Sequence, residues 1–180
     1  MPTPVLFHRS RLGGWLLALG AALAACSPAL DWRQARSADG AVEALFPCRP
    51  RLHERRVVLA GSEVKLSLMA CDTGGQTWGL ASAELADPSR HSRALDELAA
   101  AAGANLSATP RATALQVPGA MAHPGSRRLV IEGRRPDGQA VTMHLAVFAH
   151  GTRVYQATVL GAQLPEGAAD TYIGALRVAP

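Results

Sequence analysis

Residues 139–149, with the sequence QAVTMHLAVFA, decide the fold class that this chain is expected to adopt. Apolar side chains recur there at every second position, at Val141, Met143, Leu145 and Val147. A period of two is typical of a β-strand that buries one face. The turn sequence Arg135-Pro136-Asp137-Gly138 precedes the run and predicts a hairpin with residues 127–133. His150-Gly151 forms the next turn and leads into residues 152–160, which we expect to be a neighbouring strand.

The first half of the chain repeats this pattern of short alternating runs separated by turn residues. The strands predicted there are, in order, residues 31–36, 41–46, 52–59, 63–72 and 76–85. Between the first two lies Asp39-Gly40, a pair that supplies the positive φ of a tight hairpin turn. The proline-rich region from 105 to 125 predicts only an edge strand at residues 113–117.

A change of period predicts the main helix at residues 87–103. Asp87 suits the N-cap, Pro88 suits the first helical position, and Gly103 suits the stop. An apolar stripe at helical spacing consists of Leu95, Leu98, Ala99 and Ala102. Charged residues take the remaining surface, namely Arg90, Arg93, Asp96 and Glu97. A second, shorter helix is predicted from Pro165 to about residue 176.

These elements predict an α+β fold, with an antiparallel β-sheet that carries one main helix and one short C-terminal helix. The stripe of the main helix and the alternating stripe of residues 139–149 should meet and form most of the core. The sequence contains neither an internal repeat nor a second linker after residue 30. We therefore expect residues 31–180 to form a single domain.

The amino-terminal segment is typical of an export signal. Residues 1–11 carry arginines and no acidic residue, and residues 12–25 carry no charge. As a helix at ~1.5 Å per residue the uncharged run would be ~21 Å long, less than the ~30 Å of a bilayer core. This length fits the apolar part of a secretory signal peptide better than a transmembrane helix.

Leu23-Ala24-Ala25-Cys26 resembles the lipobox of bacterial lipoproteins. The resemblance implies a signal peptide at residues 1–25, a diacylglyceryl group on the thiol of Cys26, and a lipidated tether at residues 26–30. Ser27 stands where an Asp retains many lipoproteins in the inner membrane, so we expect the periplasmic face of the outer membrane. The alternative is an ordinary signal peptide, cut after Ala25, that leaves Cys26 as a free thiol.

The two remaining cysteines, Cys48 and Cys71, form an even pair in an exported chain, which predicts a disulfide. The bridge would close a loop of ~23 residues and add roughly 3 kcal/mol of stability in the chain-entropy model. The alternative is two buried thiols.

Short motifs toward both ends of the predicted domain resemble those of one structural family. They are Phe46-Pro47-Cys48-Arg49-Pro50, then Phe148, Gly151, Val154-Tyr155-Gln156 and Val159-x-Gly161, and finally Ala169-Asp170-Thr171-Tyr172-Ile173. They resemble small exported proteins with a PsbP-like fold, in particular the uncharacterised lipoproteins of beta-proteobacteria. The resemblance implies an antiparallel sheet flanked by helices over about residues 31–180. It implies no activity, because the motifs mark turns and core aromatics and a fold does not set a function.

The patterns that suggest chemistry are better explained by structure. Ser62 and Lys65 match the S-x-x-K motif of penicillin-recognising serine enzymes, but on a strand they point to opposite faces. Trp32 and Trp78 could line a ligand cleft, although a place in the core is favoured. The histidines lack the spacing of a metal site and are expected at solvated or edge positions, at His53, His91, His123, His144 and His150. We predict no catalytic residue, no metal and no cofactor.

The sequence thus predicts a lipid-anchored protein of the cell envelope, a non-catalytic binding or assembly module with an unidentified partner. Its expected contacts are the membrane, through the lipid, and an envelope protein, and the chain itself is expected to be a monomer. Nucleic acid is excluded, because no basic run interleaves with aromatic residues. Two alternatives remain open, a carrier of an apolar ligand and an enzyme whose site residues are dispersed. A deep apolar pocket would favour the carrier. A cleft with convergent His, Asp or Glu side chains would favour the enzyme, and a closed core would favour the interaction module.

Overall fold

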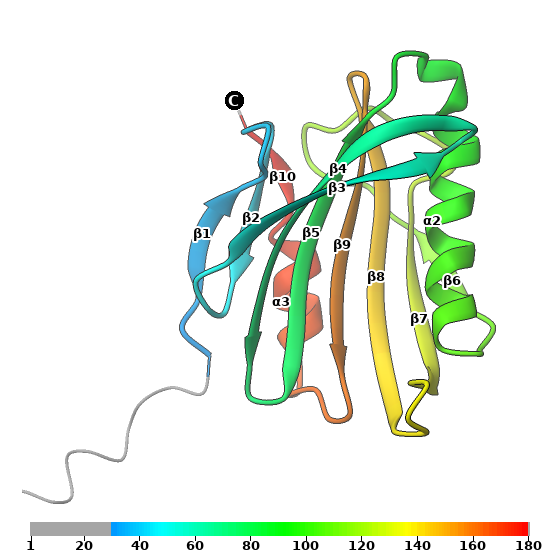
Figure 1. Ribbon diagram of the computed structural model, residues 1–180. Coiled ribbons are helices and arrows are strands. Elements are labelled where there is room, and N and C mark those ends of the chain that lie inside the picture. Colours follow the sequence, from blue (N-terminus) through cyan, green and yellow to red (C-terminus); the bar gives the residue numbers. More distant parts are fainter. Residues whose placement is uncertain (1–29, 180) are drawn as a thin grey trace, which may run out of the picture.

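The structure, a computed structural model, describes residues 30–179 (Figure 1). The predicted signal peptide, Cys26 and the tether before residue 30 lie outside the described residues. The described chain is α+β and consists mostly of strands, with two α-helices, in agreement with the predicted fold class. Neither helix within residues 30–179 is long and apolar enough to cross a membrane.

A seven-stranded antiparallel sheet forms the body of the fold, in the strand order β3-β4-β5-β9-β8-β7-β6. Positive φ angles of 51° at Ala60 and 76° at Gly61 build the two-residue turn between β3 and β4. The predicted hairpins are confirmed, with small shifts at the strand ends. The strands are β3 (Arg51–Leu59), β4 (Ser62–Thr73), β5 (Gln76–Glu84), β6 (Arg111–Ala114), β7 (Arg127–Arg134), β8 (Ala140–His150) and β9 (Arg153–Gly161).

A second, three-stranded sheet has the order β1-β2-β10. β1 (Arg33–Arg36) and β2 (Val42–Phe46) form the predicted first hairpin, with Gly40 in its turn at a φ of 77°. β10 (Arg177–Val178) pairs with β2 and was not predicted, because two residues are too few to show a period.

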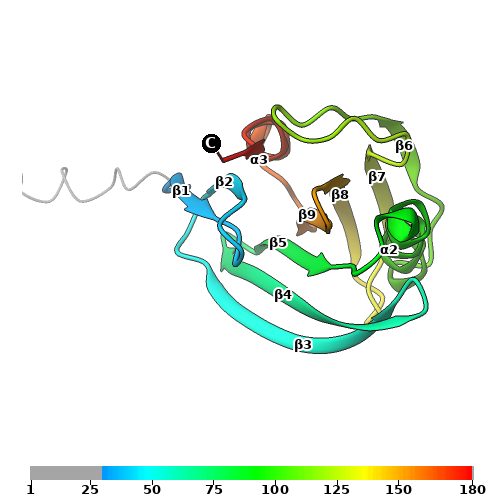
Figure 2. The same ribbon diagram turned by 90° about the horizontal axis from the view of Figure 1, so that it is seen from above.

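The main helix packs on one face of the seven-stranded sheet. α2 (His91–Asn105) buries Leu95, Ala99 and Ala102 in a cluster with Val141, Met143, Leu145 and Val147 of β8. Leu98 is half-buried against the same cluster. Figure 2 shows the sheet curving around α2, with β3 and β4 on one side and β6 and β7 on the other. The predicted meeting of the two apolar stripes is confirmed, but the prediction that they form most of the core is wrong, because a second cluster of similar size covers the other face of the sheet.

The ends of the main helix differ in how well they were predicted. Asp87 caps the start, and its carboxylate accepts a hydrogen bond from the Ser89 N–H at the beginning of a 3-10 turn, η2 (Pro88–Arg90). The predicted stop at Gly103 is wrong, because α2 continues to Asn105. A Cβ on Gly103 would lie 2.9 Å from the carbonyl oxygen of Ala108. The glycine therefore permits a close approach of the following loop and does not end the helix.

The sequence predicts only that the charged side of α2 lies on the surface. In the structure this side also contacts the β3–β4 turn. The Glu97 carboxylate accepts a hydrogen bond of 2.7 Å from the Ala60 N–H, and Arg90 donates to Ser62. Asp96 pairs with Arg127 of β7 at 2.8 Å. The helix thus holds strands on both of its sides.

A second core fills the opposite face of the seven-stranded sheet. α3 (Ala168–Gly174) confirms the predicted second helix, although it is shorter than expected, and it buries Ala169, Tyr172 and Ile173 there. Trp78 and Tyr172 lie edge to face, with ring centroids 5.4 Å apart, and Trp32 packs against Trp78 at 5.5 Å. Trp78 is fully buried, which confirms its predicted place in the core.

The predicted edge strand at residues 113–117 occurs earlier, as β6 (Arg111–Ala114). Pairing with β7 ends at Ala114, and the chain then leaves the sheet edge. Val117 becomes buried in the second core, and the carbonyl of Pro118 accepts a hydrogen bond from the Val178 N–H. This contact with the carboxyl-terminal strand shortens the edge strand.

Candidate functional site

Cys48 and Cys71 form a disulfide, as the sequence predicts. Their sulfur atoms are 2.04 Å apart and their Cα atoms 6.0 Å apart. Cys48 follows β2 and Cys71 lies in β4, so the bridge closes the base of the β3–β4 hairpin and ties it to the small sheet.

A recess of about 380 Å³ lies beside this bridge, and we call it the disulfide recess. It is lined by Cys48, Arg49, Arg51, His53, Ala70, Cys71 and Asp72. Within residues 30–179, Arg49 and Arg51 form no ion pair, whereas Asp72 accepts a hydrogen bond of 2.6 Å from Thr77. With two arginines and one aspartate, the lining of the recess carries one positive charge in excess.

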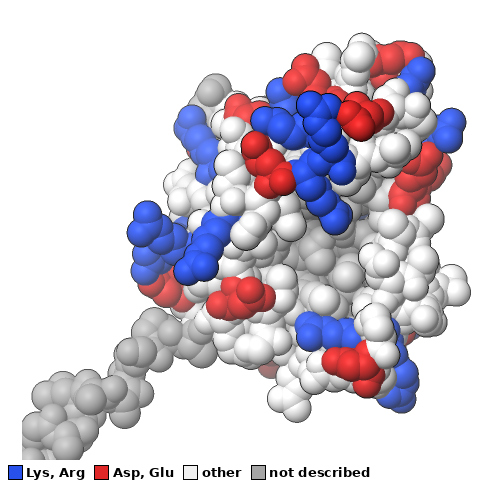
Figure 3. Space-filling view, viewed as in Figure 1, with Lys and Arg blue, Asp and Glu red and all other residues white. Residues whose placement is uncertain are grey.

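The edge strand β3 extends from the disulfide recess along the outside of the molecule (Figure 2). Eight of its nine side chains are exposed or half-buried. Leu52 is 54% exposed and Val58 is 76% exposed, the two most exposed large apolar side chains of the described chain. Figure 3 shows charges of both signs gathered over this hairpin, where the exposed charged residues are Arg51, Glu54, Arg55, Arg56, Glu63, Lys65 and Asp72.

The two faces of β3 differ in how their charges are paired. On the face of Leu52 and Val58, Glu54 pairs with Lys65 at 3.0 Å and Arg56 with Glu63 at 2.6 Å. The face toward α2 carries Arg51, His53 and Arg55, which occupy every second position of the strand. Neither of these two arginines has a carboxylate partner among the described residues. β3 thus presents one charge-paired face with exposed apolar residues and one cationic face.

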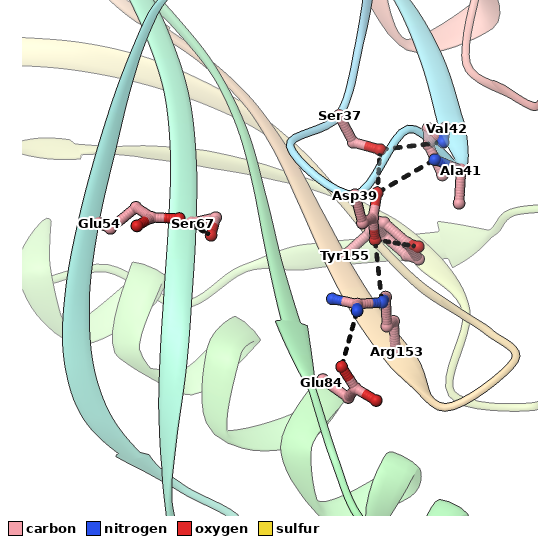
Figure 4. A network of polar contacts seen from close by, with 9 residues as sticks. All are labelled: Ser37, Asp39, Ala41, Val42, Glu54, Ser67, Glu84, Arg153 and Tyr155. Atoms are coloured by element: carbon pink, nitrogen blue, oxygen red, sulfur yellow. Dashed lines mark hydrogen bonds and ion pairs between the residues drawn. The ribbon is translucent and has the colours of Figure 1, made fainter.

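A second recess, of about 260 Å³, lies between the β1–β2 turn and the sheet, and we call it the Asp39 recess. It is lined by Ala38, Asp39, Glu54, Lys65, Ser67, Ser82, Glu84 and Arg153. Figure 4 shows Asp39 reaching from the turn to Tyr155 and Arg153 of β9, with Glu84 on the far side of Arg153. Glu54 and Ser67 form a separate pair on β3 and β4, 3.0 Å apart.

Asp39 is the most fully bonded ionisable group at this place. It accepts hydrogen bonds from the hydroxyls of Ser37 and Tyr155, the latter at 2.8 Å, and from the Ala41 N–H at 3.1 Å. The Nε of Arg153 lies 3.2 Å from the same carboxylate, and its Nη2 lies 2.6 Å from Glu84. The network braces the small sheet against the large one.

The environment moves the pKa values of both main partners away from neutral pH. Burial opposes the ionisation of Asp39, but its hydrogen bonds and the charge of Arg153 outweigh burial and lower the pKa below its ordinary value. Burial and the bond to Asp39 raise the pKa of the Tyr155 hydroxyl well above its ordinary value. A proton-transfer catalyst requires a pKa near the working pH, and neither group has one. The arrangement is suited to holding two elements together and to binding.

The structure keeps the two residues of the S-x-x-K motif apart and brings together two histidines that are distant in the sequence. Ser62 bonds to Arg90 and Lys65 pairs with Glu54, so the S-x-x-K residues do not meet. The expectation of solvated or edge histidines is wrong for His91, which is 1% exposed in the core at the start of α2. Its ring lies 6.1 Å from that of His123, a proximity that no sequence spacing indicates. Groups of three or more potential metal ligands do not occur within residues 30–179.

Sequence reasoning identified the two cysteines but missed the rest of this region. The sequence indicates Asp39 only as a turn residue, because its bond to Tyr155 joins positions far apart in the chain. The unpaired arginines of β3 were not singled out, because charge pairing depends on which strands are neighbours. No protein-family model matches this chain, and no curated protein matches it with significant similarity.

Proposed function

We propose that this chain is a non-catalytic protein-binding module of a bacterial cell envelope, held at the membrane by a lipid on Cys26. The observation that carries the binding role is the β3–β4 hairpin, an outermost hairpin closed at its base by a disulfide. It combines exposed Leu52 and Val58 with the unpaired cations Arg51 and Arg55. An exposed edge strand with unpaired charges is suited to binding a partner, because its backbone can pair and its charges select the partner.

The packing of the sheet favours this role over that of an apolar carrier. One face is filled by the cluster under α2 and the other by the aromatic cluster under α3. The recesses beside β3 and β4 are open and bordered by charged side chains. A partner that docks on the surface fits this arrangement better than a ligand enclosed in the core.

The anchor is tested by Cys26→Ser. The hydroxyl does not replace the thiolate as a nucleophile, so the variant should take up no palmitate analogue and should leave the membrane fraction. Cys48→Ser is the matched control, which should keep the label. Label on the Cys26→Ser chain would contradict the lipid anchor.

The binding role is tested in membranes with a photo-crosslinking residue placed at Leu52 or Arg55. Both positions should crosslink to one envelope protein, and the double charge reversal Arg51→Glu with Arg55→Glu should abolish the product formed from position 52. Ala112 of β6, on the opposite edge of the sheet, is the matched control position and should give none. Absence of crosslinks from both β3 positions would sink the proposal.

A further inference from the structure

We infer that β3 receives an extended acidic segment of the partner as an eighth strand of the sheet, an inference that rests on the proposed function. β3 is the outermost strand of the seven-stranded sheet, and its nine residues pair with β4 without interruption. β6, at the opposite edge, has four residues. A long unpaired edge is a template for strand addition, since its outer N–H and C=O groups have no partner in the sheet.

The turn geometry identifies the backbone groups that would receive this strand. In a hairpin with a two-residue turn, the residues that flank the turn bond to each other, and outward and inward groups then alternate along the strand. Leu59 and Ser62 flank the turn at Ala60-Gly61. The N–H and C=O groups that point away from β4 are therefore those of Leu52, Glu54, Arg56 and Val58.

The side chains of β3 determine the chemistry of the added strand. On the face toward α2, the strand would meet Arg51, His53 and Arg55, where acidic side chains supply the missing counter-charges. On the other face it would meet Leu52 and Val58, which favour apolar side chains. A strand that alternates acidic and apolar residues satisfies both faces.

A second copy of this chain fits the same edge poorly. Antiparallel pairing over the full length of two copies of β3 would place Arg55 of one copy directly opposite Arg55 of the other, and like charges directly opposite are destabilising. The same positive charges that discourage self-pairing attract an acidic strand. The expected occupant is thus a different polypeptide and not a second copy.

The test uses the full chain in detergent and an acetylated, amidated seven-residue peptide in which glutamate alternates with valine. The peptide is added at a concentration ten times its measured Kd. Hydrogen exchange of the outward amides should then slow by about tenfold, because bound chains are protected from exchange. These amides are those of Leu52, Glu54, Arg56 and Val58. The inward amide of Arg55 should change little. Nuclear magnetic resonance resolves these amides one by one.

Two altered peptides separate strand addition from simple charge attraction. Replacing glutamate by lysine should weaken binding at least about tenfold through like-charge repulsion. N-methylation of the amides on one edge removes the backbone donors and keeps every charge, and it should also weaken binding at least about tenfold. Equal binding of the N-methylated and unmodified peptides would overturn strand addition.

Variants of the chain complete the test. The double variant Arg51→Ala with Arg55→Ala should bind the unmodified peptide at least about fivefold more weakly. Arg111→Ala, on the other edge strand, should change the affinity for this peptide less than about twofold. Concentration-dependent dimers in sedimentation, or protection of the same amides by phosphatidylglycerol vesicles instead of the peptide, would overturn the proposed occupant. Crosslinks from β3 in membranes, together with no amide protection by the peptide, would overturn strand addition and leave the binding module standing.

Discussion

Asp39 determines more of the structure than its place in a hairpin turn suggests. It caps its own turn through Ser37 and Ala41 and binds Tyr155, which lies 116 positions later in the chain. Its side chain is only 8% exposed, so each of these bonds is shielded from water. A buried acceptor that loses its donors keeps the desolvation penalty, which makes the network sensitive to single changes.

Asp39→Asn should lower the free energy of unfolding by about 1–3 kcal/mol, since the amide cannot accept bonds from all of its present donors. Urea denaturation of the full chain in detergent measures the loss. Asp137→Asn is the matched control, because Asp137 occupies an equivalent Asp-Gly turn and bonds only to the N–H of Gln139. The control should change stability by less than about 0.5 kcal/mol. Equal effects of the two variants would show that the cross-sheet bonds contribute nothing.

The buried His91 and the half-buried His144 predict a loss of stability in mild acid. Burial lowers the pKa of both His91 and His144 below the ordinary value of 6.5. The unfolded chain then takes up protons at a higher pH than the folded chain, so stability declines as the pH falls below 6.5. Urea melts at pH 7 and pH 5 should show this decline, and His144→Gln should reduce it. An unchanged midpoint between the two pH values would contradict the prediction. Asp39, whose pKa is lowered, should add a further loss only as the pH falls below its ordinary value of 3.8.

At the scale of elements, local patterns predicted the strands and the start of the main helix but not every end. Alternation is visible where one face of a strand is more buried than the other, as in β7, β9 and the first half of β8, and Asp87 with Pro88 marks the helix start through local chemistry. The position of β3 at the edge of the sheet could not be predicted, because it depends on the distant pairing of β5 with β9. The Asp39 network depends on that same long-range pairing, whereas the disulfide was predicted from export and cysteine count alone. The stop at Gly103 failed because a glycine marks either a helix end or a close contact, and the sequence does not distinguish the two.

Gly103→Ala should therefore destabilise the chain, although alanine favours a helix by roughly 1 kcal/mol over glycine. The new Cβ would lie 2.9 Å from a backbone oxygen and 3.2 Å from the ring of Pro110, and overpacking of this kind costs about 1–3 kcal/mol. Gly174→Ala, at the end of α3, has open space around the new Cβ and should not destabilise. Thermal melts of both variants measure the contrast. A stabilised Gly103→Ala chain would show that the close approach of the following loop does not oppose a side chain at this position.

At the scale of the whole molecule, the disulfide links the small sheet to the hairpin that carries the proposed binding surface. Reduction should lower the free energy of unfolding by about 3 kcal/mol, as the closure of a loop of this length implies. Urea melts with and without a thiol reductant measure the difference, and Cys48→Ser should reproduce the reduced value in both buffers. A reduced chain as stable as the oxidised chain would show that the bridge adds no stability.

The same bridge also determines how tension passes through the molecule. Cys48 and Cys71 are 23 positions apart, and the β3–β4 hairpin is the segment between them. A pulling force that enters from the amino-terminal side crosses from β2 to β4 through the sulfur atoms and bypasses that hairpin. Roughly 80 Å of chain, at ~3.4 Å per extended residue, is thereby withheld from stretching. The proposed docking strand would keep its shape under a load that unravels the elements around it.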